Sequence, residues 1–166
     1  MTEFLHQRHK PLVRLDRPRE LVLICAPLRS NVNLSRIVRA ASCSGVTQLV
    51  ACGNPKIDPE ISRVDQQQLK VNLRRTLPPV LKKLKSDGFR LVGLEQTTNS
   101  HNIHEYTFVR RTALVIGNER RGLTEDVLEM LDETIEIPVY GMPFSLNVAT
   151  ATAMALYEYC RQFPRG

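Results

Sequence analysis

The amino-acid sequence predicts an α/β fold, with a mostly parallel β-sheet that is covered by helices on both faces. Short apolar runs of strand length alternate along the chain with longer segments whose apolar residues recur every three or four positions. The strand-like runs are apolar almost throughout, which is typical of parallel strands buried on both faces. The 166 residues contain no internal repeat or low-complexity linker, so they fit a single domain.

Five segments have the length and the Val, Leu and Ile content of buried strands. In chain order they are residues 20–26, 47–52, 89–96, 112–117 and 133–139. The clearest helix covers residues 31–45, where apolar side chains recur at helical spacing before a terminal glycine. The other predicted helices cover residues 58–67, 77–88, 123–131 and 145–162.

The composition is that of an ordinary globular protein, with 42% hydrophobic and 24% charged residues. No apolar run approaches the roughly 20 residues that a membrane helix needs, and the first residues lack the apolar core of a signal peptide. The cysteines, Cys25, Cys43, Cys52 and Cys160, show no paired spacing, which favours reduced, mostly buried thiols over a disulfide frame or a zinc site. We therefore expect a cytoplasmic protein.

The net charge of +6 is unevenly distributed. Residues 1–19 hold five Lys or Arg side chains against two acidic ones, and we expect them to form a basic arm that precedes a domain at residues 20–166. Basic pairs recur at positions 74–75, 82–83, 110–111 and 120–121. Such residues are either ordinary solvated surface or contacts to nucleic-acid phosphates, and composition alone does not separate the two. With 5% aromatic residues and no Trp, a base-stacking platform is not expected.

The usual cofactor and metal signatures are absent from the sequence. Ligands of parallel α/β sheets bind beyond the carboxyl ends of the strands, so functional residues are expected in the loops there. No G-x-G-x-x-G follows the first strand, and GNERRG at 117–122 lacks the Lys-Ser/Thr of a phosphate-binding loop. His101 and His104 lie three residues apart without a nearby Cys or acidic cluster, so no metal site is predicted.

Polar residues follow three of the predicted strands. Asn33 and Arg39 follow the first strand, Glu119 follows the fourth, and Ser145 and Asn147 follow the fifth. Taken singly, Asn33 and Ser145 fit helix caps, whereas Glu119 and Arg39 fit surface charges. Arg39 lies off the apolar stripe of its helix. Together at one sheet edge, these residues would form a site with a guanidinium, a carboxylate and neutral polar groups.

Three segments resemble the motifs of the SpoU–TrmH family of SPOUT RNA ribose 2′-O-methyltransferases. They are NVNLSRIVRAASCSG, VIGNERRGL and IEIPVYGMPFSLNVATATAMALYEYCRQ, and the similarity covers roughly residues 20 to 163. The third motif is the most specific of them. GLEQT at 93–97 is similar to a stretch in the branch that methylates tRNA guanosine.

The resemblance implies a SPOUT-type α/β knot, in which the C-terminal segment forms a trefoil knot around bound S-adenosylmethionine. It implies methyl transfer to a ribose 2′-hydroxyl in RNA, with tRNA favoured and a guanosine of the D-loop as the target. Ribosomal RNA as substrate, or a non-catalytic RNA-binding module, are the alternatives. A homodimer that uses the motif-one and C-terminal helices is also implied, and neither a DNA partner nor a membrane is expected.

The resemblance also assigns roles to residues. Arg39 would position the target nucleotide electrostatically, because a guanidinium with a pKa above about 12 is a poor base. Asn33 would be a scaffold residue that faces RNA, and Glu119, Ser145 and Asn147 would order the catalytic site. The residues expected to hold the cofactor, largely through backbone groups, are Leu94, Gly117, Ile137, Ser145 and Leu146.

Overall fold

A seven-stranded sheet in which every neighbouring pair is parallel forms the centre of the computed structural model, which describes residues 3–65 and 67–166. The sheet order is β3-β2-β1-β6-β4-β7-β5. The strands are β1 (Leu21–Cys25), β2 (Gln48–Cys52), β3 (Lys70–Arg74), β4 (Arg90–Leu94), β5 (His101–Asn102), β6 (Thr112–Ile116) and β7 (Glu133–Glu136). The predicted fold class is confirmed.

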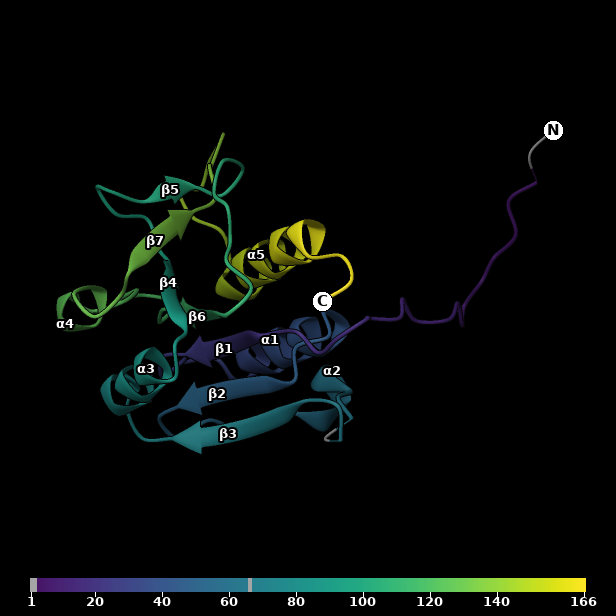
Figure 1. Cartoon of the computed structure of the whole chain (residues 1–166), viewed down its shortest axis with the longest axis horizontal. Coiled ribbons are helices and arrows are strands. Elements are labelled where there is room, and N and C mark those ends of the chain that lie inside the picture. The colour runs from purple at the N-terminus through teal and green to yellow at the C-terminus, as the bar shows by residue number, and fades with distance from the viewer. Residues whose placement is uncertain (1–2, 66) are drawn as a thin grey trace.

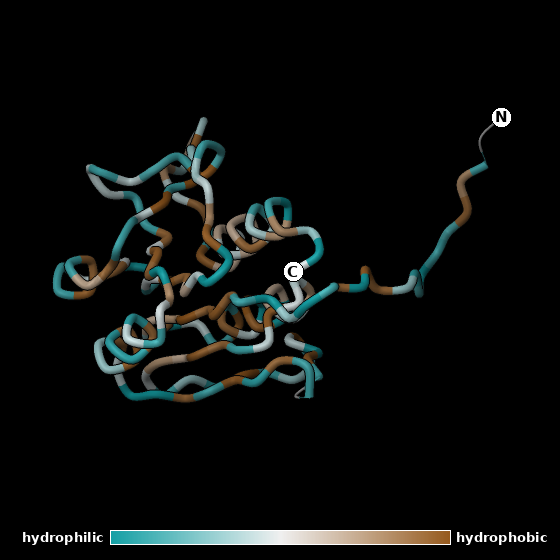
Figure 2. The backbone as a smooth tube through the Cα atoms, in the orientation of Figure 1, coloured by the Kyte–Doolittle hydropathy of each residue, from teal (hydrophilic) through white to brown (hydrophobic). Residues whose placement is uncertain are grey.

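Helices cover both faces of this sheet (Figure 1). They are α1 (Asn31–Cys43), α2 (Pro59–Ser62), α3 (Leu77–Ser86), α4 (Glu125–Leu128) and α5 (Val148–Gln162). In β1, Leu21 and Leu23 pack into the core that α1 and α5 share, whereas Val22 and Ile24 pack into the core under α3 and α4. This burial on both sides explains the uninterrupted apolar runs, which are brown in Figure 2.

Two strands, β3 and β5, were not predicted because they lie at the edges of the sheet. An edge strand has one neighbour and carries polar side chains, so its sequence lacks the apolar run of a central strand. In β3, Val71 packs against the core but Leu73 is 53% exposed. In β5, only two residues pair with β7.

Each of the five predicted helices is present but shorter than predicted, and α1 and α3 begin at the predicted residue. Asp58 caps α2 and Pro59 opens it, yet the helix ends after one turn because Arg63 adopts a left-handed backbone conformation with φ of 47°. The predicted helix at 58–67 included Gln66, which lies outside the described residues. The last helix begins at Val148 rather than Ser145, because residues 138–147 form a loop.

The N-terminal segment leaves the body of the protein as an extended, exposed stretch over residues 3–14 (Figure 1); residues 1–2 of the predicted arm lie outside the described part. Arg19, at its base, is 7% exposed and donates hydrogen bonds to the carbonyls of Ser44 and Phe163, both at 2.6 Å. Its guanidinium also lies 5.9 Å from the ring centroid of Tyr159. The residue thus joins the base of the arm to the ends of α1 and α5.

The cysteines are all free thiols, but only Cys25 and Cys52 are buried. Cys160 is half-buried and Cys43 is exposed, so the expectation of mostly buried thiols was right for only part of the set. Burial raises the pKa of Cys25 to about 12 and that of Cys52 to about 11, which keeps both protonated at neutral pH. In the described ranges, no helix is long and apolar enough to cross a membrane, and no cluster of potential metal ligands occurs.

Candidate functional site

A cavity of about 290 Å³ lies beyond the carboxyl ends of β4, β6 and β7, where ligands of parallel sheets bind. Its apolar wall includes Ile116, Val139 and Val148. The residues that the sequence predicts to hold a cofactor all line it, namely Leu94, Gly117, Ile137, Ser145 and Leu146. Three loops that are remote in the sequence therefore meet at one cavity.

The loop after β6 is closed on itself at this cavity. The backbone groups of Asn118 and Gly122 exchange two hydrogen bonds of 3.0 and 2.9 Å. A Cβ atom at Gly117 would lie 2.6 Å from the Gly122 carbonyl carbon, so the tight loop requires glycine there. A bulky residue at position 117 would disrupt the loop itself before it tested any contact with a ligand.

Glu95 holds the same loop from the end of β4, a role that sequence reasoning missed. Its Oε2 accepts the backbone N–H of Leu123 at 2.9 Å, and its Oε1 accepts that of Gln96 at 3.1 Å. The only feature of the sequence that could have indicated a role for Glu95 is its position directly after Leu94 in the GLEQT stretch. Glu95, Glu119 and Glu136 all line the cavity, so three acidic residues surround it. A cationic ligand would be favoured by these groups.

Glu119 connects the cavity to the first turn of α1. Its Oε2 accepts the Arg29 N–H at 2.8 Å, and its Oε1 accepts the Ser30 N–H at 3.0 Å and the Asn33 side-chain amide at 3.2 Å. The Oδ1 atom of Asn33 then accepts the side-chain amide of Asn147 at 3.1 Å. These contacts join all three strand exits that the sequence singled out.

The pKa of Glu119 is lowered from its ordinary value. Partial burial of the carboxyl group raises the pKa, but the hydrogen bonds from the Arg29 and Ser30 amides and from Asn33 outweigh it. The side chain is therefore an anion at neutral pH, held next to the N-terminus of α1, where the helix dipole favours negative charge.

The capping residues differ from those considered in the sequence. Ser30 caps α1 by accepting the Asn33 backbone N–H at 3.1 Å. Asn147 caps α5 by accepting the backbone N–H groups of Ala149 and Thr150 at 2.9 and 3.3 Å. The capping interpretation of Asn33 and Ser145 was wrong. Asn33 belongs to the Glu119 network, and Ser145 lines the cavity.

Arg39 lies apart from this network within the single chain. It is exposed on α1, six residues after Asn33 and so about 9 Å further along the helix axis. Its Nη1 approaches the Ile61 carbonyl at 3.5 Å, which is a weak contact. Within one chain, the structure brings Asn33, Glu119, Asn147 and the cavity together, but not Arg39.

Known proteins are similar to this chain in sequence and in fold. A tRNA (guanosine(18)-2′-O)-methyltransferase of Aquifex aeolicus is 35% identical over 152 residues, which is 88% of this chain and 71% of that protein. The crystal structure of an A. aeolicus TrmH/SpoU tRNA modifying enzyme superimposes with a TM-score of 0.78 at 32% identity, covering 90% of this chain and 78% of that one. The SpoU methyltransferase AviRb from Streptomyces viridochromogenes, in complex with the cofactor AdoMet, gives a TM-score of 0.75 at 26% identity, covering 92% and 64%.

The share of each relative's length that this chain covers varies widely. A mouse tRNA (guanosine(18)-2′-O)-methyltransferase is 30% identical over 86% of this chain, which spans only 9% of the mouse protein. Residues 20–157 match the SpoU rRNA Methylase family, which takes in all three motif segments up to Tyr157 in α5. From this match and the shared fold, the chain belongs to the SpoU methylase family.

Proposed function

We propose that this protein transfers a methyl group from S-adenosylmethionine to the ribose 2′-hydroxyl of a nucleotide in RNA, with tRNA as the favoured substrate. The observation that carries the proposal is the Glu119–Asn33–Asn147 network, which borders a cavity lined by all five expected cofactor residues. The similar AdoMet-bound structure and the relatives named as tRNA methyltransferases support the reaction and its substrate.

The cavity fits S-adenosylmethionine in its chemistry. The apolar side chains of Leu94, Ile137 and Leu146 would contact the adenine ring, and backbone groups near Gly117 would bind its polar edge. Glu95 and Glu136 would face the positively charged groups of the cofactor. When bound, S-adenosylmethionine supplies an electrophilic methyl group on a cationic sulfur.

The residues around the cavity would orient the RNA ribose and stabilise charge as its proton leaves. Asn33 and Asn147 are fixed by their mutual hydrogen bond, and Glu119 fixes Asn33. Such preorganised groups lower a barrier because they need not reorient during the reaction. Arg39 would bind the phosphate next to the target ribose and stabilise the developing alkoxide.

We further propose a homodimer in which Arg39 completes the site of the partner. The outer face of α5 exposes Met154 and Tyr157, at 44% and 78%, beside an apolar cavity of about 510 Å³ that Ile103 also lines. Val32 of α1 is exposed as well. Apolar groups gathered on a surface in this way fit association with a second copy through α1 and α5.

Complementation between two inactive variants tests this arrangement. Mixing Arg39→Ala with Glu119→Ala chains gives heterodimers in which, if Arg39 acts across the interface, one of the two sites has both residues intact. If Arg39 acts across the interface, the mixture recovers about a quarter of wild-type activity, since half the dimers are mixed and half their sites are complete. Absence of recovery, with dimers confirmed by light scattering, would place Arg39 in its own chain's site. A monomer at micromolar concentration would contradict the dimer.

The experiment that tests the reaction uses methyl-labelled cofactor with tRNA and ribosomal RNA fragments. We expect label in tRNA, recovered in alkali-resistant dinucleotides because a 2′-O-methyl group blocks cleavage of the adjacent phosphodiester. Label in ribosomal RNA alone would select that substrate instead. Binding of S-adenosylmethionine without transfer to either RNA would fit a non-catalytic module. A cytoplasmic setting fits the free thiols of the chain.

We also infer that the C-terminal segment is threaded as a trefoil knot. The inference rests on the family and on the way the loop before α5 meets the loops after β4 and β6 at one cavity. A knot shortens a chain that is pulled from both ends. An extended length equal to the full contour, about 3.3–3.6 Å per residue, would contradict it.

A further inference from the structure

The basic pairs of the sequence differ in their environments. Arg110 and Arg111 are engaged within the fold, because their guanidinium groups lie 4.8 and 4.7 Å from the ring centroids of Phe163 and Phe89. Arg111 also pairs with Glu20 at 3.5 Å, and Lys83 pairs with Asp87 at 3.0 Å. In contrast, Arg74, Arg75, Arg120 and Arg121 are exposed, and none of them makes an ion pair with a described residue.

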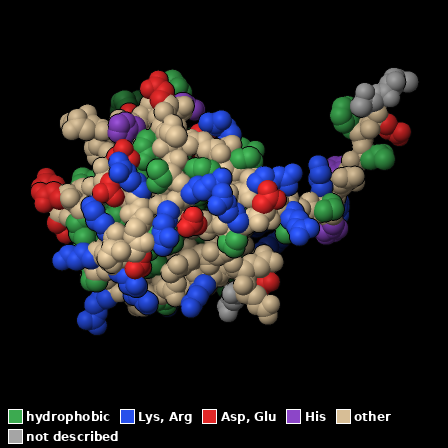
Figure 3. Space-filling model, in the orientation of Figure 1, with side chains coloured by type: hydrophobic (Ala, Val, Ile, Leu, Met, Phe, Trp, Pro, Cys, Tyr) green, Lys and Arg blue, Asp and Glu red, His purple; other side chains and the backbone are tan. Residues whose placement is uncertain are grey.

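The paired and the unpaired basic residues lie at opposite ends of the strands. Of the five ion pairs among residues 3–65 and 67–166, four join residues close to the amino ends of strands, as in Arg90 with Glu133 at 3.0 Å. The unpaired arginines follow the carboxyl ends of β3 and β6, and exposed Arg29 follows that of β1. Figure 3 shows Lys and Arg side chains interspersed with acidic ones over the body, so only the contacts distinguish the two edges.

The unpaired arginines all follow the carboxyl ends of strands on one half of the sheet, and we call them the carboxyl-edge band (Arg29, Arg74, Arg75, Arg120 and Arg121). Arg121 lines a cavity of about 260 Å³ together with Thr76, the neighbour of Arg75, and Pro27, which lies two residues before Arg29. The band reaches from β3 across β2 and β1 to β6, a distance of roughly 14 Å at the usual strand spacing. At its β6 end, Arg120 lines the cofactor cavity.

Among the described residues, no acidic side chain forms an ion pair with an arginine of this band, although the carboxyl groups of Glu95 and Glu119 lie near its β6 end. The carboxylate of Glu119 is occupied by the Arg29 and Ser30 backbone amides, and that of Glu95 by the Leu123 amide. Asp126 lines the same cavity as Arg121 but forms no ion pair with it. Unpaired guanidinium groups arranged along an edge are suited to a row of phosphates.

We infer that the carboxyl-edge band binds the phosphate backbone of the RNA that flanks the methylated nucleotide. This inference rests on the proposed function for its partner and extends it by naming the surface that the strand follows. The contacts are electrostatic, so they strengthen binding to any RNA sequence rather than selecting one. The strand would run from the exposed end of β3 to the rim of the cofactor cavity.

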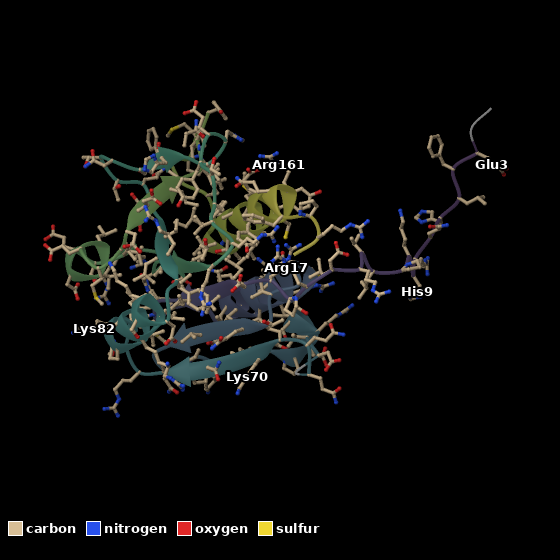
Figure 4. All side chains as sticks on the ribbon, in the orientation of Figure 1. Glu3, His9, Arg17, Lys70, Lys82 and Arg161 are labelled. Atoms are coloured by element: carbon tan, nitrogen blue, oxygen red, sulfur yellow. The ribbon has the colours of Figure 1, made fainter. Side chains whose placement is uncertain are left out.

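The test measures equilibrium binding of a tRNA transcript over a range of salt concentrations, without methyl transfer. The double variant Arg74→Ala/Arg75→Ala should bind roughly tenfold more weakly, and its log–log salt slope should fall by about 1.5, the value for two lost phosphate contacts. The matched control is Lys82→Ala/Lys83→Ala, which removes the same charge from α3, where Figure 4 labels Lys82. The control should bind within twofold of wild type.

Two results would overturn the inference. One is an unchanged affinity and salt slope in the Arg74/Arg75 variant, and the other is an equal loss in the control. Affinity for S-adenosylmethionine should stay at the wild-type value in both variants, because neither pair lines the cofactor cavity. If the wild-type protein transfers no methyl group, the proposed reaction fails, while the binding comparison still decides the role of the band.

Discussion

Replacing Glu119 by Ala tests whether its carboxylate organises the site. The change removes acceptors for three donors, at 2.8, 3.0 and 3.2 Å. Hydrogen bonds to charged groups contribute about 1.5–3 kcal/mol each, and partial exposure reduces this to about 1 kcal/mol per bond, since water replaces part of each contact. We expect the free energy of unfolding to fall by about 3 kcal/mol. The melting temperature of a chain of this size should then fall by about 6–12 °C.

Glu119→Gln is the matched control, because its amide oxygen still accepts from Ser30 and Asn33 while its NH₂ group faces the Arg29 amide. It should lose about half as much stability as the Ala variant. The carboxylate has a lowered pKa in the folded state, so its stabilisation is present above pH 4.5 and is lost as the pH falls through that lowered value. In calorimetric scans, the difference in melting temperature between wild type and Glu119→Gln should therefore shrink as the pH is lowered. A melting temperature within 2 °C of wild type for the Ala variant at pH 7 would refute the network in solution.

Three other substitutions test separate parts of the structure. Arg39→Ala should lower the single-turnover rate at saturating RNA by roughly two to four orders of magnitude without changing the fold, and Arg39→Lys should restore little of that rate. A rate within threefold of wild type would contradict the assignment of Arg39. An equal loss in Arg36→Ala, a variant of an exposed neighbour, would contradict it as well. Glu95→Ala should weaken binding of S-adenosylmethionine in calorimetry by roughly tenfold or more, because the loop it holds is released, whereas Glu95→Gln keeps an acceptor for the Leu123 amide and should lose less. Arg19→Met should destabilise the fold by about 2 kcal/mol in denaturant titrations, since two partly buried carbonyls lose their donor, and a loss below about 0.5 kcal/mol would show that the base of the arm is not held there.

The sequence predicted the central strands and the long helices because their burial is local and periodic. β1 and β6 are buried at every position, and α1 repeats its apolar residues at helical spacing. The edge strand β3 escaped prediction because its alternating residues include Lys70 and Arg74. The one-turn helices α2 and α4 were predicted, but with bounds several residues too long.

The candidate site was predictable only through the resemblance of its motifs to a known family. No periodicity indicates that Glu119 contacts Asn33, 86 residues earlier, or that Asn147 contacts Asn33 across 114 residues. Such contacts depend on the order of strands in the sheet, which local patterns do not encode. Glu95 went unassigned for the same reason, since its partner is a backbone amide 28 residues away.

The position of the cavity walls along the chain has a consequence for synthesis in the cell. Every lining residue lies between Leu94 and Ala151, and α5, which carries the last of them, packs on α1 near the start. A nascent chain that has emerged only as far as β6 therefore has its N-terminal strands but no complete ligand site. S-adenosylmethionine at 100 times its Kd would stabilise the finished protein by about 2.7 kcal/mol, yet would contribute nothing to these earlier intermediates. Until α5 is made, the part of the shared core that α5 covers stays exposed, and exposed apolar surface favours aggregation of the growing chain.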